Sequence, residues 1–297
     1  MGFFGKLFEK KVCDICGDEI GLLGNRKLED GNCCKNCAGK LSPWFEERRH
    51  STVEQIKQQL AYREQNARDL ENFAVFKVMG DGDKMYIEEV AGKLTRFFVT
   101  DASNYKAANP DIISFRDVSS CTVDIDVQDE EIKQRNSEGQ MVSYNPPRFK
   151  HHYNFIIRMG IMNNPYFDDI HFTINKEVVT MESVGGAGPR FATMPRRNIR
   201  NYKGFFAHPR TKDERRYNEY LMESEHIEAL VSMGRKAAQR AEENLDEHVQ
   251  HAAPVLRSEA EQQAPSAAQP AARPKLCPNC GAPDDGSKFC QNCGSRL

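Results

Sequence analysis

Ten cysteines stand in the sequence, and all but Cys121 lie in two clusters near the ends of the chain. The first cluster lies within CDICGDEIGLLGNRKLEDGNCCKNC and the second within CPNCGAPDDGSKFCQNC. Each cluster contains two Cys-x-x-Cys pairs, and each pair lets two sulfurs from one tight turn face the same ion. Four thiolates around a tetrahedral Zn²⁺ make a closed site with no open position for water. These residues therefore predict metal binding that stabilises a fold, not catalysis.

The two clusters predict two structural Zn²⁺ sites with four ligands each. The predicted ligands are Cys13, Cys16, Cys34 and Cys37 at the N-terminal end, and Cys277, Cys280, Cys290 and Cys293 at the C-terminal end. The 17 residues between the N-terminal pairs are within the spacing of known zinc sites. Cys33 is left over, and a Cys33–Cys37 pair would also have an allowed spacing, but we expect Cys34 to be the ligand. Disulfides or redox thiols are the alternative.

Composition sets limits on the class of protein. A chain of 297 residues is long enough for about two ordinary domains. Charged residues make up 28% of it, the mean hydropathy is -0.67, and the net charge of -2 favours no class of partner. No apolar run approaches the ~18 residues that span a bilayer, and MGFFGKLFEKK lacks the features of a signal peptide. We therefore expect a cytoplasmic location, where paired cysteines bind metal more often than they form disulfides.

Residues 51–72 predict one amphipathic helix after an N-terminal zinc module of residues 1–50. Ser51 and Glu54 have the spacing of a capping box. Val53, Ile56, Leu60 and Leu70 form an apolar stripe at helical spacing, which Arg63 and Ala67 interrupt. We expect the single tryptophan, Trp44, to pack this helix against the zinc module.

Residues 73–240 predict an antiparallel β domain that ends in a helix. Six or seven strands follow one another with turns between them, which indicates a sandwich or a barrel. We expect the polar stretch at residues 129–150 to form a long hairpin loop and residues 183–210 to form an irregular loop. Thr211 and Glu214 have capping-box spacing at the start of the helix, which we expect to fray after Gly234.

The remaining residues predict a flexible linker at 241–274 and a C-terminal zinc module at 275–297. Residues 251–274 are rich in Ala, Pro and Gln and cannot bury enough apolar surface to offset the entropy of ordering. The expected fold class is thus α+β and multidomain. An antiparallel β domain with a C-terminal helix lies between two small four-cysteine ribbons.

Three parts of the chain resemble known families. Residues 12–50, with the paired cysteines, GLLGNRKLEDG and KLSPWF, resemble the N-terminal zinc ribbon of bacterial proteins classed as domain of unknown function 4428. That family has no assigned activity, so the resemblance implies zinc binding and a bacterial origin only. The tail resembles the bacterial zinc-ribbon module CPNCG…KFCxNCG. The order of elements in the middle is similar to a pleckstrin-homology-like (GRAM-type) barrel.

A basic segment at residues 190–216 is a candidate binding surface. It carries nine basic and two acidic residues, a local net charge of +7, and aromatic residues lie among them. Charge interleaved with aromatic rings suits single-stranded nucleic acid or an anionic membrane, although a solvated loop over the β domain explains it as well. The candidate contact residues are Arg190, Arg196, Arg197, Arg200, Lys203 and Arg210.

Other polar motifs predict no catalytic site. GGAGPR at 185–190 lacks the Gly-Lys-Ser/Thr ending of a phosphate loop. His151 and His152 are adjacent on a strand and point to opposite faces, while Asp124 and Asp126 share a face that we expect to be solvated. The N-terminal GFFGKLF could contact a membrane surface or pack against the first ribbon.

The sequence thus predicts a non-enzymatic, zinc-binding adapter or scaffold with protein partners and no small-molecule substrate. A module tethered on a linker raises its effective concentration at a partner. The alternatives are a regulator that binds nucleic acid through the ribbons and the basic segment, and a protein that associates peripherally with anionic membranes.

Overall fold

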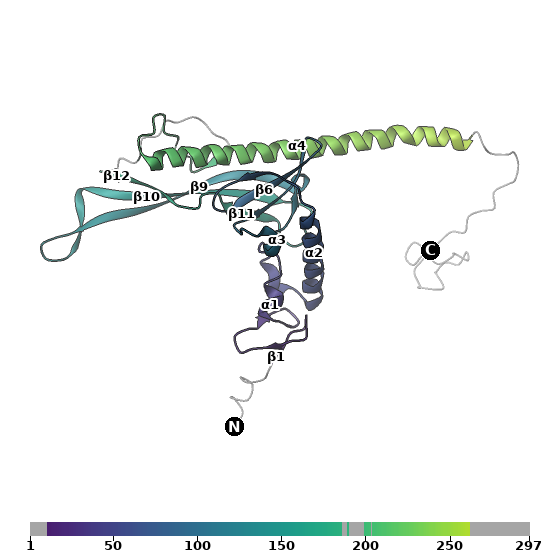
Figure 1. The fold of residues 1–297 in the computed structure, drawn as a ribbon, viewed down its shortest axis with the longest axis horizontal. Helices are drawn as coiled ribbons and strands as arrows, with labels where there is room; N and C mark the ends of the chain where they lie inside the picture. Colours follow the sequence, from purple (N-terminus) through teal and green to yellow (C-terminus); the bar gives the residue numbers. More distant parts are fainter. Residues whose placement is uncertain (1–10, 186–188, 190–198, 203, 262–297) are drawn as a thin grey trace, which may run out of the picture. The chain divides into compact units, whose positions relative to one another are not determined.

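The computed structural model describes residues 11–185, 189, 199–202 and 204–261. The chain divides into two compact units, Met1–Glu243 and Asn244–Leu297. The first unit contains a small N-terminal module, helix α2 and a β domain (Figure 1). The elements of the module and the helix are β1 (Lys11–Val12), β2 (Glu19–Ile20), β3 (Arg26–Lys27), β4 (Asn32–Cys33), α1 (Lys35–Ala38), η2 (Glu47–His50) and α2 (Val53–Glu71).

The N-terminal module is two short antiparallel hairpins with a small core of their own. β1 pairs with β2, and β3 pairs with β4. The four-residue helix α1 follows β4 directly. Ile20 and Leu28 are buried with the cysteines, and Ile56 from the first turns of α2 completes this core. A module with so few apolar residues needs another source of stability, which a bound metal would supply.

The N-cap of helix α2 is Thr52, one residue later than the predicted cap, Ser51. Thr52 accepts a hydrogen bond from Gln55 N at 3.3 Å, and the Gln55 side chain accepts one from Thr52 N at 2.8 Å. The predicted cap, Ser51, is instead buried and donates to the Glu47 carbonyl. Both residues have a hydroxyl, so the position of the preceding 3-10 turn decides which of them caps the helix.

The β domain contains two open sheets. Its elements are β5 (Val75–Met79), β6 (Lys84–Val90), β7 (Lys93–Thr100), α3 (Tyr105–Ala108), β8 (Ile113–Ser114), η3 (Phe115–Asp117), β9 (Val118–Arg135), β10 (Met141–Ile161), β11 (Asp169–Thr173), β12 (Val179–Val184), β13 (Ile199–Arg200) and α4 (Lys212–Glu261). One sheet has the order β5-β6-β7-β8. The other has the order β11-β10-β9-β13, with β12 paired to β10.

The predicted antiparallel β architecture is confirmed, but the predicted barrel is not. All pairings in the two sheets are antiparallel except that of β13 with β9, and neither sheet closes within the described residues. One core joins the two sheets and α4. Phe97 from the first sheet, Phe155 from the second and Tyr217 from α4 are all fully buried in it. The helix covers apolar faces that a closed barrel would turn inward.

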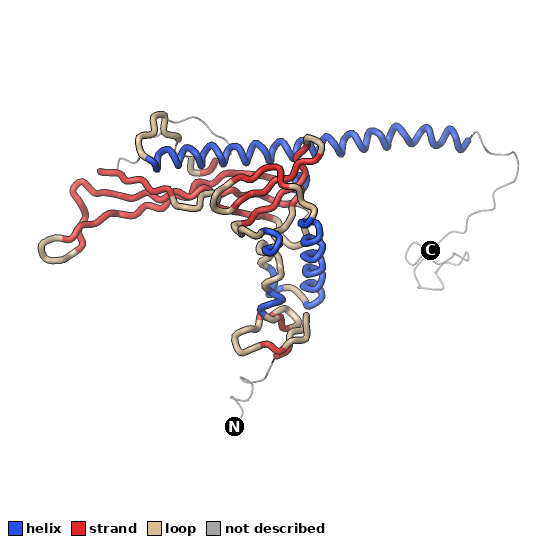
Figure 2. The backbone as a smooth tube through the Cα atoms, in the orientation of Figure 1, coloured by secondary structure: helices blue, strands red, loops and turns tan. Residues whose placement is uncertain are grey.

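Most of residues 129–150 form strand, where we expected a long loop; only 136–140 lie outside the two strands. β9 continues to Arg135 and β10 begins at Met141, so the connection is short (Figures 1 and 2). The register shifts between Ser143 and Arg148, where the Asn145–Pro146 bond is cis. We call residues 131–147 the β9–β10 arm. A two-stranded arm has no buried face, so its polar composition, which suggested a loop, is compatible with strand.

Helix α4 begins as predicted but does not fray at Gly234. Glu214 N donates to Thr211 Oγ1 at 3.1 Å, and Thr211 N donates to the Glu214 carboxylate at 3.1 Å, which is the predicted capping box. The helix continues to Glu261 and so includes the first part of the segment predicted to be a linker, 241–274. That part is rich in Ala and Glu, which favour helix. Residues 262–274 lie outside the described chain.

Trp44 packs on the β domain and not between α2 and the zinc module as predicted. Its ring lies against the main core, with its centroid 6.3 Å from that of His171. Its neighbour Phe45 packs on the core of the zinc module instead. The two aromatic side chains thus fasten the segment between η2 and α1 to different cores.

Candidate metal centre

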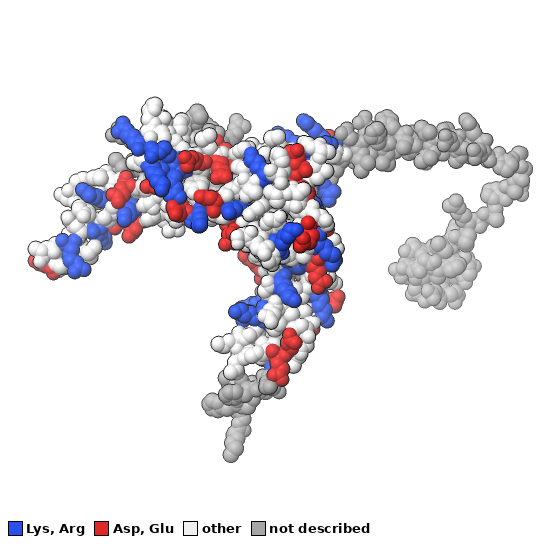
Figure 3. Space-filling model, in the orientation of Figure 1, with Lys and Arg blue, Asp and Glu red and all other residues white. Residues whose placement is uncertain are grey.

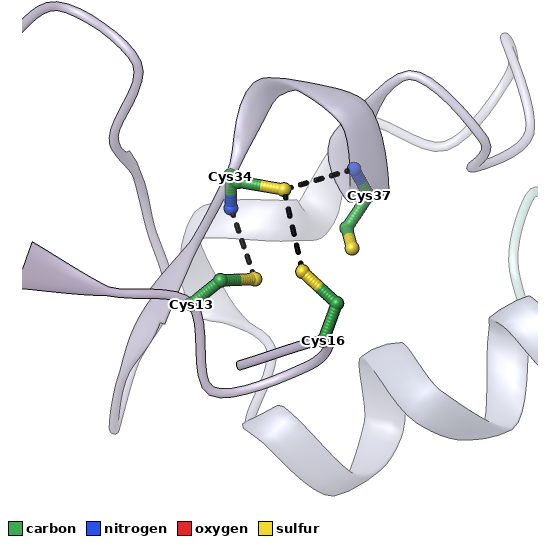
Figure 4. A group of neighbouring side chains, drawn as sticks. All are labelled: Cys13, Cys16, Cys34 and Cys37. Carbon is green, nitrogen blue, oxygen red and sulfur yellow. Dashed lines mark hydrogen bonds between the residues drawn. The ribbon is translucent and has the colours of Figure 1, made fainter. Parts of the chain in front are cut away.

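Four cysteine sulfurs come together in the N-terminal module. The ligand atoms of Cys13, Cys16, Cys34 and Cys37 all lie within 4.8 Å of one another (Figure 4). Cys13 and Cys16 belong to the turn after β1, whereas Cys34 precedes α1 and Cys37 lies within it. Two turns from separate hairpins thus present two sulfurs each to one point. These are the four N-terminal residues that the spacing predicts.

The separation of the sulfurs fits a tetrahedral zinc ion. The Sγ atoms of Cys16 and Cys34 are 3.8 Å apart. Zn–S bonds of about 2.3 Å place the corners of a tetrahedron roughly 3.8 Å from one another. A disulfide would require about 2.05 Å, and the described cysteines are free thiols. Both the donor set and its dimensions therefore fit Zn²⁺.

Backbone N–H groups already point at the sulfurs. Cys34 N donates to the sulfur of Cys13 at 3.2 Å, and Cys37 N donates to the sulfur of Cys34 at 3.3 Å. Gly17, directly after the first pair, has a φ of 81° and donates its N–H to the Cys13 carbonyl. Such a φ is readily adopted only by glycine. The backbone is thus arranged to stabilise thiolates.

The thiols of Cys13 and Cys37 differ in acidity, because their pKa values shift in opposite directions. Burial opposes ionisation of Cys13, but several backbone N–H groups, led by that of Cys16, outweigh it and lower its pKa to about 6. Burial and the neighbouring sulfurs raise the pKa of Cys37. Without a cation, negative charges this close repel one another, so the thiols resist full ionisation together. A dication removes that repulsion and would be bound with the release of protons.

Cys33 is not one of the four clustered cysteines, in agreement with the preference for Cys34. It is fully buried on β4, and its thiol donates to the Cys34 carbonyl. Burial raises its pKa to about 11. Successive residues on an extended strand point to opposite sides, so only one of the two adjacent cysteines can face the cluster.

A buried ion pair joins the zinc module, α2 and the β domain. Arg63 of α2 and Asp111, directly before β8, are 2.6 Å apart, with side chains only 6% and 0% exposed. Ser42, at the exit of the zinc module, donates to the other Asp111 oxygen at 2.8 Å. Arg63 also donates to the Lys40 carbonyl. The sequence analysis did not predict this ion pair. The charge of Arg63 within the apolar stripe of α2 was the feature that could have indicated a buried partner.

Most of the other predicted site residues lie outside the part of the chain that the structure describes. Cys277, Cys280, Cys290 and Cys293 lie outside the described residues, as do Arg190, Arg196, Arg197 and Lys203. Arg200 is exposed at the end of β13. Arg210 is exposed before α4, and its backbone N–H donates to the Glu214 carboxylate.

The polar residues of the second sheet are paired across strands. His151 contacts Asp129 and Ser183, each at 2.7 Å, whereas His152 contacts Thr180 at 3.1 Å. Asp124 accepts from Arg158 at 3.2 Å. These contacts account for the residues as cross-strand pairs.

In the described residues, no helix is long and apolar enough to cross a membrane.

The comparisons with known proteins agree with the cysteine chemistry. No curated protein and no solved structure matches the chain. Residues 11–59 match the family model described as Domain of unknown function (DUF4428), and residues 276–297 match the model described as zinc-ribbon domain. The matches and the four-cysteine cluster together support Zn²⁺ binding.

Proposed function

We propose that this chain is a non-catalytic adapter whose zinc ribbons stabilise modules that bind other proteins. The observation that carries the proposal is the β9–β10 arm. Every residue from Gln128 to Lys150 is at least partly exposed, and Met141 is 58% exposed. An arm with no buried residue contributes nothing to the hydrophobic core, and its side chains are accessible to a partner.

The arm also offers free strand edges. β13 pairs with β9 only at Val123 and Asp124, and β12 pairs with β10 only from Arg148 to Tyr153. Within the described residues, the outer edges of the arm thus have no partner strand. An exposed edge is suited to strand addition by an extended peptide, in which main-chain hydrogen bonds supply affinity.

The zinc sites suit a binding role. Four protein ligands would fill the coordination sphere of Zn²⁺ at the N-terminal cluster, so the ion would hold the fold and activate no water. We extend the same role to the C-terminal ribbon. For the β domain we retain the pleckstrin-homology-like architecture as a proposal, supported by the order of an antiparallel strand series followed by a helix.

Shortening the arm tests the adapter role. Replacing residues 133–147 with Asn-Gly would join Ile132 to Arg148, which face each other in the register, through a tight turn. The full chain, this short-arm variant and Cys290→Ser would each be used to capture proteins from host lysate after nuclease treatment. We expect specific proteins on the full chain, and we expect the short-arm variant to lose them while it keeps its melting temperature.

The controls separate the outcomes. If the short-arm variant captures the same proteins as the full chain, the arm is not the contact surface. If Cys290→Ser alone loses them, the C-terminal ribbon is the contact. If nuclease removes every captured protein, the nucleic-acid alternative replaces the adapter role. Binding through the basic segment should then weaken steeply with salt and be lost when Arg196, Arg197 and Arg200 become Gln.

A further inference from the structure

Two leucines at the tip of the N-terminal module are left in solvent. Leu22 and Leu23, between β2 and β3, are 81% and 91% exposed. They are more exposed than any other large hydrophobic residue in the described chain. Their neighbours Ile20 and Leu28 are buried in the core of the module. The tip therefore carries apolar surface that the module itself does not use.

The tip is a hydrogen-bonded turn. Gly24 N donates to the Gly21 carbonyl at 2.9 Å, which closes the chain around the two leucines. The Arg26 guanidinium donates to the carbonyl oxygens of Leu23 and Asn25, at 3.3 and 3.4 Å. These bonds satisfy backbone groups at the tip and hold the leucines outward.

A basic hollow is lined by the residues that follow this turn in the chain, from Asn25 onward, and by residues of η2. It has a volume of about 690 Å³, and its charged lining residues are Arg26, Lys27, Arg48, Arg49 and Glu29. Arg48 donates to the Lys27 carbonyl at 2.7 Å and so joins η2 to β3. Across the described part of the chain, none of the four cations forms an ion pair. The hollow thus has a surplus of positive charge.

We propose that this end of the module binds an anionic membrane. Leu22 and Leu23 would enter the boundary between headgroups and acyl chains, and the four cations would contact lipid phosphates. Exposed apolar side chains and cations follow one another directly in this hairpin, a combination that suits the hydrocarbon and phosphate layers of a bilayer. The surface is separate from the arm, so this proposal does not depend on the adapter role.

Local charge and not net charge would drive the contact. Residues 11–50 contain seven basic and seven acidic residues, and Figure 3 shows both signs on the N-terminal module. Long-range attraction to a membrane is therefore weak, and binding requires the leucines and the cations together. A single myristoyl-sized apolar group gives only marginal binding, which is why two signals are needed.

Vesicle sedimentation of the full, zinc-loaded chain tests the proposal. Vesicles of phosphatidylcholine would be compared with vesicles that also contain phosphatidylserine. The first variant, Leu22→Ser with Leu23→Ser, removes the apolar tip. The second, Lys27→Gln with Arg49→Gln, removes two cations whose side chains form no hydrogen bond or ion pair among the described residues, unlike those of Arg26 and Arg48. Met222→Ser with Met233→Ser is the matched control, since these methionines are 68% and 60% exposed on α4.

We expect the wild-type chain and the methionine control to sediment with phosphatidylserine vesicles and not with phosphatidylcholine alone. The leucine variant and the Lys27/Arg49 variant should each bind at least about tenfold more weakly. The first loses the apolar groups that enter the bilayer, and the second loses two cations that each contribute about 1 kcal/mol near an anionic surface. Unchanged zinc content would show that the variants are folded. The proposal is wrong if the wild-type chain does not sediment with phosphatidylserine vesicles. It is also wrong if either the leucine variant or the Lys27/Arg49 variant binds them as the wild type does.

Discussion

At the scale of single residues, Cys34 has two roles in the N-terminal module. Its sulfur belongs to the metal cluster and also accepts the Cys37 N–H as the N-cap of α1. Its own N–H donates to the sulfur of Cys13. Loss of this side chain would remove a ligand and the cap of a four-residue helix at once.

The adjacent cysteines offer a direct test of the ligand set. We expect Cys34→Ser to lower the zinc content of the full chain from two ions to one, because three sulfurs do not close a structural site. Cys33→Ala should keep both ions, since Cys33 lies outside the cluster, and lose about 1 kcal/mol of stability from packing. Native mass spectrometry would count the ions. Retention of two ions by Cys34→Ser would contradict this ligand set.

Glu88 predicts a pH dependence of stability. Arg96 donates to both of its carboxylate oxygens, at 2.7 and 2.8 Å, and this contact lowers the pKa of Glu88 below its ordinary value of 4.5. A lowered folded-state pKa adds stability that is fully present above pH ~4.5 and is lost as pH falls through the folded value. We expect Glu88→Gln to destabilise the protein by about 1–2 kcal/mol at neutral pH.

Urea unfolding of the wild type and of Glu88→Gln at several pH values measures this effect. The difference between the two should shrink as pH falls below ~4.5. Loss of zinc in acid affects both proteins and cancels in the difference. A difference that stays constant down to acid pH would show that the ion pair contributes no stability.

At the scale of elements, α4 packs on η3 through a glycine. A Cβ at Gly234 would lie 2.5 Å from the Phe115 ring, which is itself fully buried. The helix can approach this closely only because Gly234 has no side chain. A residue type that usually weakens a helix interior is here required by packing.

Gly234→Ala therefore reverses the usual effect of this substitution. In an exposed helix it would add up to about 1 kcal/mol of stability. Here we expect it to destabilise the β domain by about 1–3 kcal/mol through overpacking, measured by thermal unfolding. Gly234→Ala with Phe115→Leu should recover part of the loss. A more stable single variant would show that the helix and η3 are not in close contact.

The Arg63–Asp111 pair couples α2 to the β domain. Asp111→Asn would leave a buried guanidinium without a counter-charge, so we expect a loss of about 3–5 kcal/mol. Replacing both residues with apolar ones, Arg63→Met with Asp111→Leu, should be far less costly. Denaturant unfolding of the single and double variants would measure the coupling. If the single and the double variant lose the same free energy of unfolding, the unpaired Arg63 charge is not the cause of the loss, and the prediction is wrong.

At the scale of the whole molecule, the zinc module and the β domain have separate cores. The core of the module contains its cysteines, and the core of the β domain contains residues of the two sheets and α4. We expect a chelator to abolish amide protection in residues 11–45 while β9 and β10 stay protected, as hydrogen exchange would show. Loss of protection in both would mean that zinc supports the entire fold.

Local patterns in the sequence determined the chemistry of this protein. The cysteine spacing predicts the N-terminal ligand set because two tight turns alone decide where paired sulfurs point. The capping box at Thr211 and Glu214 and the antiparallel strand order also depend on residues close in the chain. Each of these was predictable because its signal, a Cys-x-x-Cys pair, a capping box or a turn between consecutive strands, lies within a few residues of the chain.

Only the tertiary structure decided which distant residues meet. Arg63 interrupts an apolar stripe, but its partner Asp111 is 48 residues away. Trp44 could have packed on either core, and the β domain holds it because His171 lies there. Strands β9 and β10 extend through a polar segment because each supplies the other's backbone hydrogen bonds, which no periodicity within one segment reveals. A side chain at Gly234 would collide with the Phe115 ring, and only the folded chain brings these two residues together.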